Sequence, residues 1–378
     1  MTVTSWDDYP VHQSANWIAH VATSDRNFYD RYYFNAFDTG GRFMAVFGLG
    51  QYPNLGTTDA FVTVRAGEQQ HVVRASRPLG DRADMQVGPL RVEVLEPLKR
   101  LRFVCEPPTG SGPPTGSGPP TGSGAEYSIA ADLTWEGFGP AIPEPNQFIR
   151  AGARVIFDTQ RLAQMGSWSG TLEVGGESLT VSPDTTWGSR DRSWGVRTVG
   201  EPEHPGIMAS MPRGAGNMWS YFPMRFEDHS IYYICAESDT GARSLEQSER
   251  VWHDGRIEQL GRTEHHHEFV PGTRLLAHST ISFPDAGFDI DCTSILPSFI
   301  AVGTGYGLEA DWRHGMYQGP ETVVQSFVHE VAEIAELGGL ALVDHSGAFS
   351  YEDASGRHSG FGLYEHAFSG TFPRYGLE

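Results

Sequence analysis

One stretch near the middle of the chain is dense in groups that can bind and react. Residues 187–195 read Trp-Gly-Ser-Arg-Asp-Arg-Ser-Trp-Gly. Side chains alternate between faces in an extended strand, so Arg190 and Arg192 share one face and Asp191 takes the other. An Asp on an apolar face is desolvated, which raises its pKa and keeps it protonated as a general acid. The alternative is structural: Asp191 pairs with an arginine and fixes a joint between two halves of the protein.

Two further clusters place acids and a histidine beside aromatic residues. Residues 311–317 read Asp-Trp-Arg-His-Gly-Met-Tyr, and in a strand His314 shares a face with Trp312. His314 is therefore a candidate to activate or receive a water, with a hydrogen-bonded turn as the alternative. Glu365, in the sequence Tyr-Glu-His near the end of the chain, is the rival of Asp191 as the acid.

A histidine run raises the question of a metal site. Residues 264–268 read Glu-His-His-His-Glu, and His265 and His267 point the same way in a strand. Two such imidazoles can share a metal ion, but no third ligand with suitable spacing is evident, so we predict a solvated strand face and no metal. The sequence also contains no Gly-x-Ser-x-Gly elbow, no Cys-x-x-Cys pair and no phosphate loop after a strand, which argues against serine-hydrolase, structural-zinc and nucleotide functions.

The composition of the chain limits the classes of molecule that the protein is expected to bind. The 378 residues carry a formal net charge of -20, which disfavours nucleic acid and anionic membrane surfaces as partners. No apolar run approaches the roughly 20 residues that span a bilayer, so we expect no stable membrane insertion. The three cysteines (Cys105, Cys235 and Cys292) are far apart and fit buried thiols of a reducing compartment. With no signal-peptide pattern in residues 1–8, a cytoplasmic location is expected. A second copy of the chain, giving a homodimer, is an open alternative.

The spacing of apolar residues and turns predicts an all-β protein. The 45 Gly and 24 Pro residues, with no long 3.6-residue apolar period, are typical of many short strands joined by turns. Helices are expected only at about residues 5–22 and 322–330. Residues 107–124 repeat Pro-Pro-Thr-Gly-Ser-Gly three times, which indicates a flexible linker inside a hairpin loop. We predict a helical segment at 1–27 and two β-barrel or sandwich domains at 28–198 and 199–378.

Several blocks resemble a known superfamily. Residues 191–195, Asp-Arg-Ser-Trp-Gly, are similar to the Asp-His-Asn-Trp-Gly block of the carotenoid 1,2-hydratase (hydroxyneurosporene synthase) superfamily. The longer form at 187–197 and the blocks at 50–54, 310–317 and 363–366 resemble an uncharacterised actinobacterial branch. The chain departs from the hydratase pattern at Arg192 and Ser193, and it has Thr185 and Thr186 where another Trp is expected. The resemblance implies two lipocalin-like domains and cofactor-free, acid-catalysed addition of water to an alkene, or its reverse.

These considerations give a specific hypothesis. Asp191 is the acid, and His314, Tyr317 or Glu365 assists. The substrate is small, lipophilic and terpenoid-like, and aromatic faces stabilise its carbocation. An isomerase or cyclase that uses the same acid is one alternative, and a non-catalytic carrier of a lipophilic ligand is another. The predicted substrate-binding residues are Tyr52, Trp187, Trp194, Tyr306, Trp312 and Tyr364.

Overall fold

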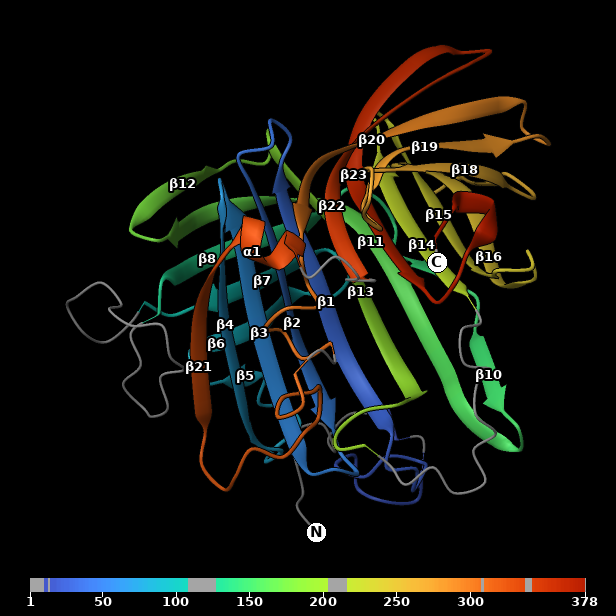
Figure 1. Ribbon diagram of the computed structural model, residues 1–378. Helices are drawn as coiled ribbons and strands as arrows, with labels where there is room; N and C mark the ends of the chain where they lie inside the picture. The colour runs from blue at the N-terminus through green and yellow to red at the C-terminus, as the bar shows by residue number, and fades with distance from the viewer. Residues whose placement is uncertain are drawn as a thin grey trace.

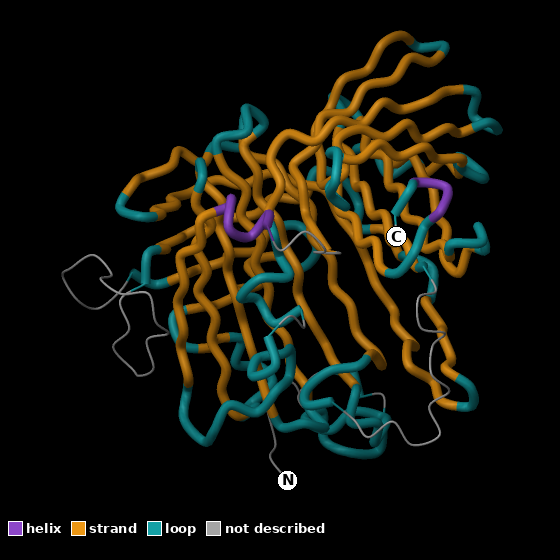
Figure 2. The backbone as a smooth tube through the Cα atoms, viewed as in Figure 1, coloured by secondary structure: helices purple, strands orange, loops and turns teal. Residues whose placement is uncertain are grey.

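The computed structural model describes residues 10–12, 14–107, 127–202, 216–306, 309–336 and 342–377. Within these ranges nearly all regular structure is β-strand, as Figure 2 shows, which confirms the all-β prediction. The strands form two curled antiparallel sheets that lie side by side, each forming a half-barrel (Figure 1). None of the helices in the described ranges is long and apolar enough to cross a membrane.

The first sheet is built mainly from the first half of the chain. Its 14 strands include three short ones that pair with β11, namely β9 (Ile142–Pro143), β10 (Gln147–Ala151) and β12 (Glu177–Val181). The other strands follow one another across the sheet in the order β21 (Val323–Glu330), β4 (Gln69–Pro78), β3 (Thr57–Ala66), β2 (Phe43–Tyr52), β1 (Phe28–Asp38), β13 (Thr186–Arg197), β11 (Arg154–Val174), β8 (Ile129–Gly137), β7 (Arg100–Cys105), β6 (Leu90–Glu96) and β5 (Gln86–Val87).

The second sheet comes from the second half of the chain. Its nine strands run in the order β17 (Ile257–Gln259), β16 (Arg243–Trp252), β15 (His229–Ser238), β14 (Asn217–Arg225), β23 (Gly356–Ser369), β22 (Leu342–Asp353), β20 (Phe288–Ser298), β19 (Leu276–Phe283) and β18 (Glu264–Phe269). A short helix, α1 (Val331–Glu336), and a 3-10 turn, η2 (Pro373–Tyr375), complete the described elements.

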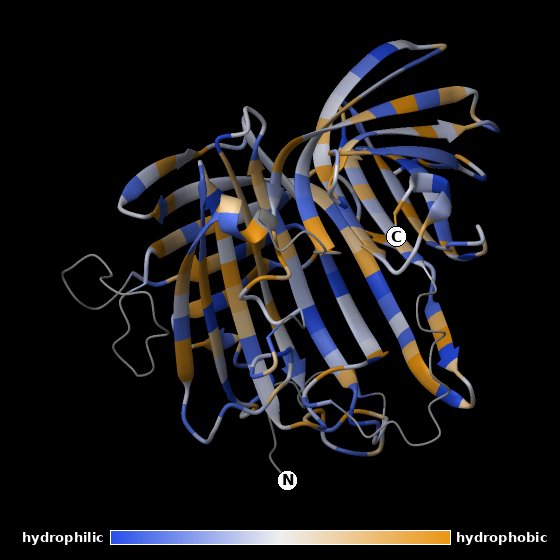
Figure 3. Ribbon diagram, in the orientation of Figure 1, coloured by the Kyte–Doolittle hydropathy of each residue, from blue (hydrophilic) through white to orange (hydrophobic). Residues whose placement is uncertain are grey.

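Strands near the junction of the sheets are buried on both faces. All ten positions of β2 are buried. Phe43 and Phe47 enter the core inside the first sheet, whereas Met44 and Val46, on the opposite face, enter the core between the two sheets. β15 repeats this pattern in the second sheet, with alternate residues in the inner core and in the shared core. This double burial explains the near-continuous apolar sequence of β2. Many other strands alternate between hydrophilic and hydrophobic residues, as the changing colours in Figure 3 show.

Two predicted helices are wrong or only partly described. Residues 323–330, expected to be helical, form the strand β21, which pairs with β4 at the edge of the first sheet. In Figure 1 β21 has the orange-brown colour of the later part of the chain, whereas the strands beside it have the blue colours of the N-terminal part. The β-branched Val323, Val324 and Val328 suit this pairing, and the helix α1 begins only at Val331. Residues 10–12 and 14–22 form turns and bends, not the predicted helix, while residues 1–9 lie outside the described part.

Two other expectations concern the middle of the first sheet. Residues 153–157 and 166–174, predicted as separate strands, belong to the single long strand β11. The hairpin on either side of the hexad repeat is confirmed, because β7 pairs antiparallel with β8. The repeat itself, from residue 108 onward, lies outside the described residues. The three cysteines are buried and free, as predicted.

Candidate active site

The candidate site lies where the two sheets face each other. The strands β1, β13 and β11 of the first sheet supply one wall, and β14, β23 and β22 of the second supply the other. The Tyr33 hydroxyl donates a hydrogen bond across this space to the Asp344 carboxyl group. The Arg161 guanidinium carbon lies 5.0 Å from the centre of the Trp219 ring, so a cation from the first sheet stacks on an aromatic ring of the second.

On the second sheet, two carboxyl groups sit side by side. Asp344 of β22 and Glu365 of β23 are directly opposite in the strand register, so their side chains share one face. The Trp219 indole N–H donates to Glu365 Oε1 at 2.7 Å. Burial, and then the neighbouring Asp344, raises the pKa of Glu365 well above its usual range. Burial also raises the pKa of Asp344. The two groups therefore form a pair that retains a proton at neutral pH.

On the first sheet, the alternation predicted around Asp191 is confirmed. Arg192 turns to the opposite face and pairs with Asp30 at 2.6 Å, and Arg190 Nε donates to Gln164 Oε1 at 2.9 Å. The expectation of an apolar surrounding is wrong, because neighbouring strands bring other arginines to the Asp191 face. Burial raises the pKa of Asp191, but the charges of three arginines oppose that rise, namely Arg161, Arg31 and Arg197.

A fourth carboxyl group, from the Pro-rich segment between β8 and β11, was not predicted. Glu144 Oε2 pairs with Arg161 Nε at 3.3 Å, and the Glu144 side chain is only 3% exposed. Burial raises the pKa of Glu144 to about 7, against the effect of the Arg161 charge. No local sequence pattern points to Glu144, because the arginine that pairs with it comes from the strand β11.

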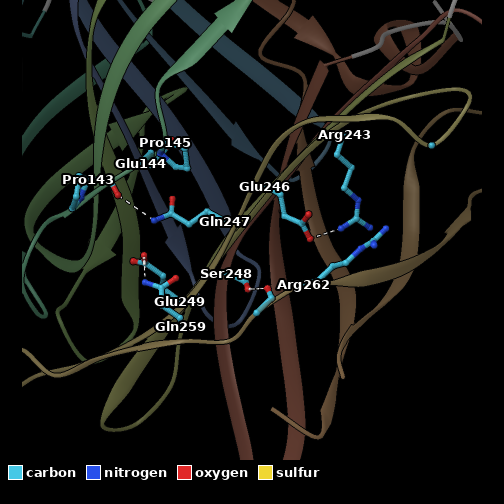
Figure 4. A pocket seen from close by; sticks show the side chains of 12 residues that line it. Pro143, Glu144, Pro145, Arg243, Glu246, Gln247, Ser248, Glu249, Gln259 and Arg262 are labelled. Carbon is cyan, nitrogen blue, oxygen red and sulfur yellow. Dashed lines mark hydrogen bonds and ion pairs between the residues drawn. The ribbon is translucent and has the colours of Figure 1, made fainter. Parts of the chain in front are cut away.

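Beyond Glu144 lies an open polar groove of about 850 Å³ (Figure 4). Its polar side chains are already engaged: Arg243 bonds Glu246, and Gln259 Nε2 donates to Glu249 Oε1 at 2.6 Å. Figure 4 also shows Gln247, whose amide nitrogen donates to the Pro143 carbonyl at 3.1 Å. Because these side chains bond to one another, they are not free to bind a substrate. We therefore place the reaction at the carboxyl groups between the sheets.

His314 lies beside a second cavity, of about 510 Å³, which it lines together with Tyr306 and Arg197. Its Nε2 lies 2.9 Å from the Thr304 carbonyl oxygen and donates to it, so Nδ1 is the acceptor. Arg31 Nη1 donates to that Nδ1. Burial, then the charges of Arg31 and Arg197, lowers the pKa of His314 well below its usual range. His314 is therefore a neutral, fixed hydrogen-bond partner of an arginine.

The aromatic predictions separate into two groups. Trp187 lies in the core between the sheets, where its ring meets Phe361 at 5.8 Å, and Tyr306 borders the cavity. Tyr52 is buried beside the same region and donates to Asp59 Oδ1 at 3.1 Å. By contrast, Tyr317 is 53% exposed and Trp194 is 38% exposed. The structure does not bring these two exposed residues together with the carboxyl groups.

Trp312 and Tyr364 are buried elsewhere. The Trp312 ring stacks under Arg74, whose guanidinium carbon lies 4.3 Å from the ring centre. Tyr364 faces the inner core of the second sheet, opposite to its neighbour Glu365, and hydrogen-bonds Ser279. Strand alternation accounts for this separation, because residues 364 and 365 must point to opposite faces.

The side chains of His265 and His267 are buried, so the predicted solvated face is wrong for these two, whereas His266 is exposed. His265 and His267 stack with ring centres 5.0 Å apart, and His267 Nδ1 lies 2.6 Å from Ser279 Oγ. Within the described ranges, the group of possible metal ligands found is Cys235, Glu237 and His265. Arg374 and Arg243 already contact the Glu237 carboxylate, at 2.8 Å and 3.2 Å, an arrangement typical of an ion-pair network.

Residues 3–378 match the model of the family of unknown function DUF8625. The chain belongs to that family. No curated protein sequence matches it. Two solved structures share the fold. Kievitone hydratase from Nectria haematococca has a TM-score of 0.51 and 13% identity, over 90% of this chain and 89% of that chain. An AttH-type protein from Nitrosomonas europaea has a TM-score of 0.51 and 12% identity, over 91% and 92%.

Proposed function

We propose that this protein is a cofactor-free hydro-lyase that adds water to, or removes it from, a lipophilic, terpenoid-like alkene or alcohol. The observation that carries the proposal is the Asp344–Glu365 pair. None of the ion pairs of the described residues involves Asp344 or Glu365, and the charge of Arg161, which lowers the pKa of Glu365, is outweighed by burial and by Asp344. A carboxyl group kept neutral by burial and by a like neighbour is what protonation of an unactivated alkene requires.

The proposed reaction begins with a proton from Glu365. The proton forms a C–H bond at one alkene carbon, and the electron pair of the double bond leaves a carbocation at the other. Water then attacks the cation and forms the C–O bond, and the deprotonated carboxylate of the pair takes the surplus proton. Dehydration follows the same steps in reverse, with protonation of the hydroxyl group and loss of water.

The surrounding residues suit the charge that develops. Trp219 donates to Glu365, and Tyr221, directly opposite Glu365 in the register, lies on the same face. Aromatic faces stabilise a desolvated cation by roughly 0.5 to 2 kcal/mol each. Tyr33 holds Asp344 through its hydrogen bond and is therefore a positioning residue. The charge of Asp191 adds negative potential from the opposite wall.

The fold and the sequence blocks support the proposal from a different direction. Kievitone hydratase, which is a hydratase by name, shares the fold. The block that resembles carotenoid 1,2-hydratases includes Asp191, and the block at 363–366, which resembles an uncharacterised actinobacterial branch, includes Glu365. Because fold alone does not decide activity, the proposal depends on the carboxyl pair and not on the likeness.

The test uses isoprenoid alkenes and alcohols incubated with the protein in heavy water. A proton transferred from Glu365 exchanges with solvent, so the product should contain a C–D bond at the protonated carbon. We expect Glu365→Gln to lower the rate of deuterium incorporation by about 10²- to 10⁴-fold, the usual contribution of a general acid. The matched control is Glu352→Gln, an exposed carboxyl group on β22, which should leave the rate unchanged.

The outcomes also distinguish the alternatives. Deuterium in a product that has not gained or lost water indicates an isomerase or cyclase that uses the same acid. Ligand binding by the wild type without any deuterium incorporation indicates a carrier and contradicts the proposal. Equal rates for Glu365→Gln and the wild type would remove Glu365 as the acid.

A further inference from the structure

The cavity of about 510 Å³ beside His314 has an unusual balance of charge. Its described lining contains Arg154, Arg197 and Arg313 but no acidic residue. The chain as a whole has a formal net charge of -20, so the positive charge of a cavity lined by three arginines contrasts with the negative charge of the whole protein. A concentration of positive charge in a concave site attracts anions.

Two of the cations near this cavity converge on one neutral atom. Arg31 Nη1 and, at 3.4 Å, Arg197 Nη2 both donate to His314 Nδ1. Neither arginine forms an ion pair with a carboxylate of the described residues. Asp59 is close enough to act on Arg31 through space, but its oxygens accept from the Tyr52 hydroxyl and the Gly315 N–H. The two guanidinium groups thus share a neutral hydrogen-bond acceptor, and the carboxyl groups of Asp59 and Asp191 act on them only through space.

Several N–H groups here are buried without a hydrogen-bond partner. They are Nε and Nη2 of Arg31 and Nε of Arg197. Arg31 is only 2% exposed. A cation with unmade hydrogen bonds is costly, so the Arg197 guanidinium, whose residue lines the cavity, gains from a ligand that supplies oxygen acceptors. Arg31 does not line the cavity, but its guanidinium carbon lies 5.2 Å from the centre of the Tyr306 ring, which does, so its positive charge adds to that of the wall.

Part of the cavity wall is apolar. Val155, Ile156, Phe157 and Val199 line it beside the arginines. These side chains can contact a hydrocarbon chain, but they offer nothing to free phosphate or another small inorganic anion. Tyr306 borders the cavity and packs against the same core between the sheets as Trp219, which bonds Glu365. Tyr306 therefore connects the cavity with the surroundings of the carboxyl pair.

We propose that the substrate is an amphipathic organic anion, whose carboxylate binds to Arg197 and Arg313 while its apolar part extends toward Asp344 and Glu365. This inference rests on the proposed function, because it assigns the substrate class of the same site. It makes the arginines substrate-binding groups and separates binding, at one end of the site, from proton transfer at the other.

The test compares farnesoic acid with farnesol, which share one carbon skeleton and differ in charge. Binding to the full-length protein is measured by calorimetry at about pH 8, where the acid is ionised. We expect the wild type to bind the acid at least about tenfold more tightly than the alcohol, and Arg197→Gln to lose roughly tenfold for the acid only. Arg197→Lys, which keeps the charge, should recover part of that loss.

The matched control is Arg192→Gln, on the same strand but on the opposite face, which should bind the acid as the wild type does. If Arg197→Gln does not fold, Arg313→Gln tests the same cavity. Equal affinity of the wild type for acid and alcohol, or equal losses in Arg197→Gln and Arg192→Gln, overturns the inference. Binding needs no turnover, so the two proposals can fail separately. Acid-selective binding without deuterium incorporation would support this inference and contradict the proposed function. Deuterium incorporation without acid-selective binding would support the proposed function and contradict this inference.

Discussion

The two walls of the space between the sheets hold carboxyl groups in opposite electrostatic settings. On the first sheet, Asp191 faces arginines of β1, β11 and its own strand β13, whose charges oppose the rise in its pKa. On the second, Asp344 and Glu365 lie side by side, and Asp344 adds to the rise in the pKa of Glu365, which Arg161 alone among the arginines opposes. Burial raises the pKa of all three groups. The comparison shows that charged neighbours, and not burial alone, set the pKa of each buried acid.

The largest expected difference between the walls is in activity. Asp344→Asn keeps the shape of the side chain but removes the like charge that raises the pKa of Glu365. We expect the rate at neutral pH to fall about 100-fold and the loss of activity with rising pH to begin at a lower pH. Asp191→Asn should cost less than about tenfold. Rates measured across pH for both variants check this, with the exposed Tyr317→Phe as control, and a larger loss in Asp191→Asn would reverse the comparison.

The next difference is in stability. Arg161→Gln leaves Glu144 buried without its ion-pair partner, so we expect the free energy of unfolding to fall by about 2 kcal/mol, somewhat less than for a fully buried pair. The control is Arg102→Gln, whose ion pair with Asp132 has side chains 35% and 48% exposed and should contribute less than about 1 kcal/mol. Urea unfolding of both variants measures the difference. Equal losses of unfolding free energy in the two variants would show that Arg161 does not stabilise a buried carboxylate.

A third expected difference is the dependence of the unfolding free energy on pH. Because the pKa of Asp344 is higher in the folded than in the unfolded protein, the folded state binds its proton more tightly. The unfolding free energy is therefore greatest when Asp344 is protonated and falls as pH rises from about 4, the unfolded value, through the folded value.

Asn cannot ionise, so Asp344→Asn should lack this part of the decline. The expected relative gain of the variant is about 1.4 kcal/mol for each unit of pKa shift. Urea unfolding of the wild type and Asp344→Asn at about pH 4 and pH 8 measures it. If the two proteins respond to pH in parallel, Asp344 has an ordinary pKa and the pair does not hold a proton.

Much of the fold follows from local sequence, and the exceptions have physical reasons. Alternating apolar residues and Gly-rich turns locate most strands, because those patterns reflect burial of one face. The helix expected at residues 322–330 failed because the segment borders β4 at a sheet edge, a partner some 250 residues away in the sequence that no local pattern reveals. The single strand β11 was divided for a similar reason, since its continuity depends on pairing with β13 and β8.

The site was predictable only in part. Strand alternation correctly turned Asp191 away from Arg190 and Arg192, and Glu365 was recognised as a rival acid. Arg197 lies on the same strand, six residues after Asp191, so alternation could have placed it on the Asp191 face. Arg31 and Arg161, however, come from the strands β1 and β11, and spacing within the motif carries no information about them. Asp344 acquires its importance only from its register with Glu365. The homodimer, the cytoplasmic location and the actinobacterial branch stay predictions.

The most direct test of the central claim is to detect the proton on the carboxyl pair. Infrared difference spectroscopy distinguishes a protonated carboxyl group from a carboxylate, and comparison of variants assigns the band. At about pH 7 we expect the wild type to show a protonated-carboxyl band that Glu365→Gln strongly reduces and Asp191→Asn leaves in place. A band that persists in Glu365→Gln and disappears in Asp191→Asn would contradict the account and return the acid to the first sheet.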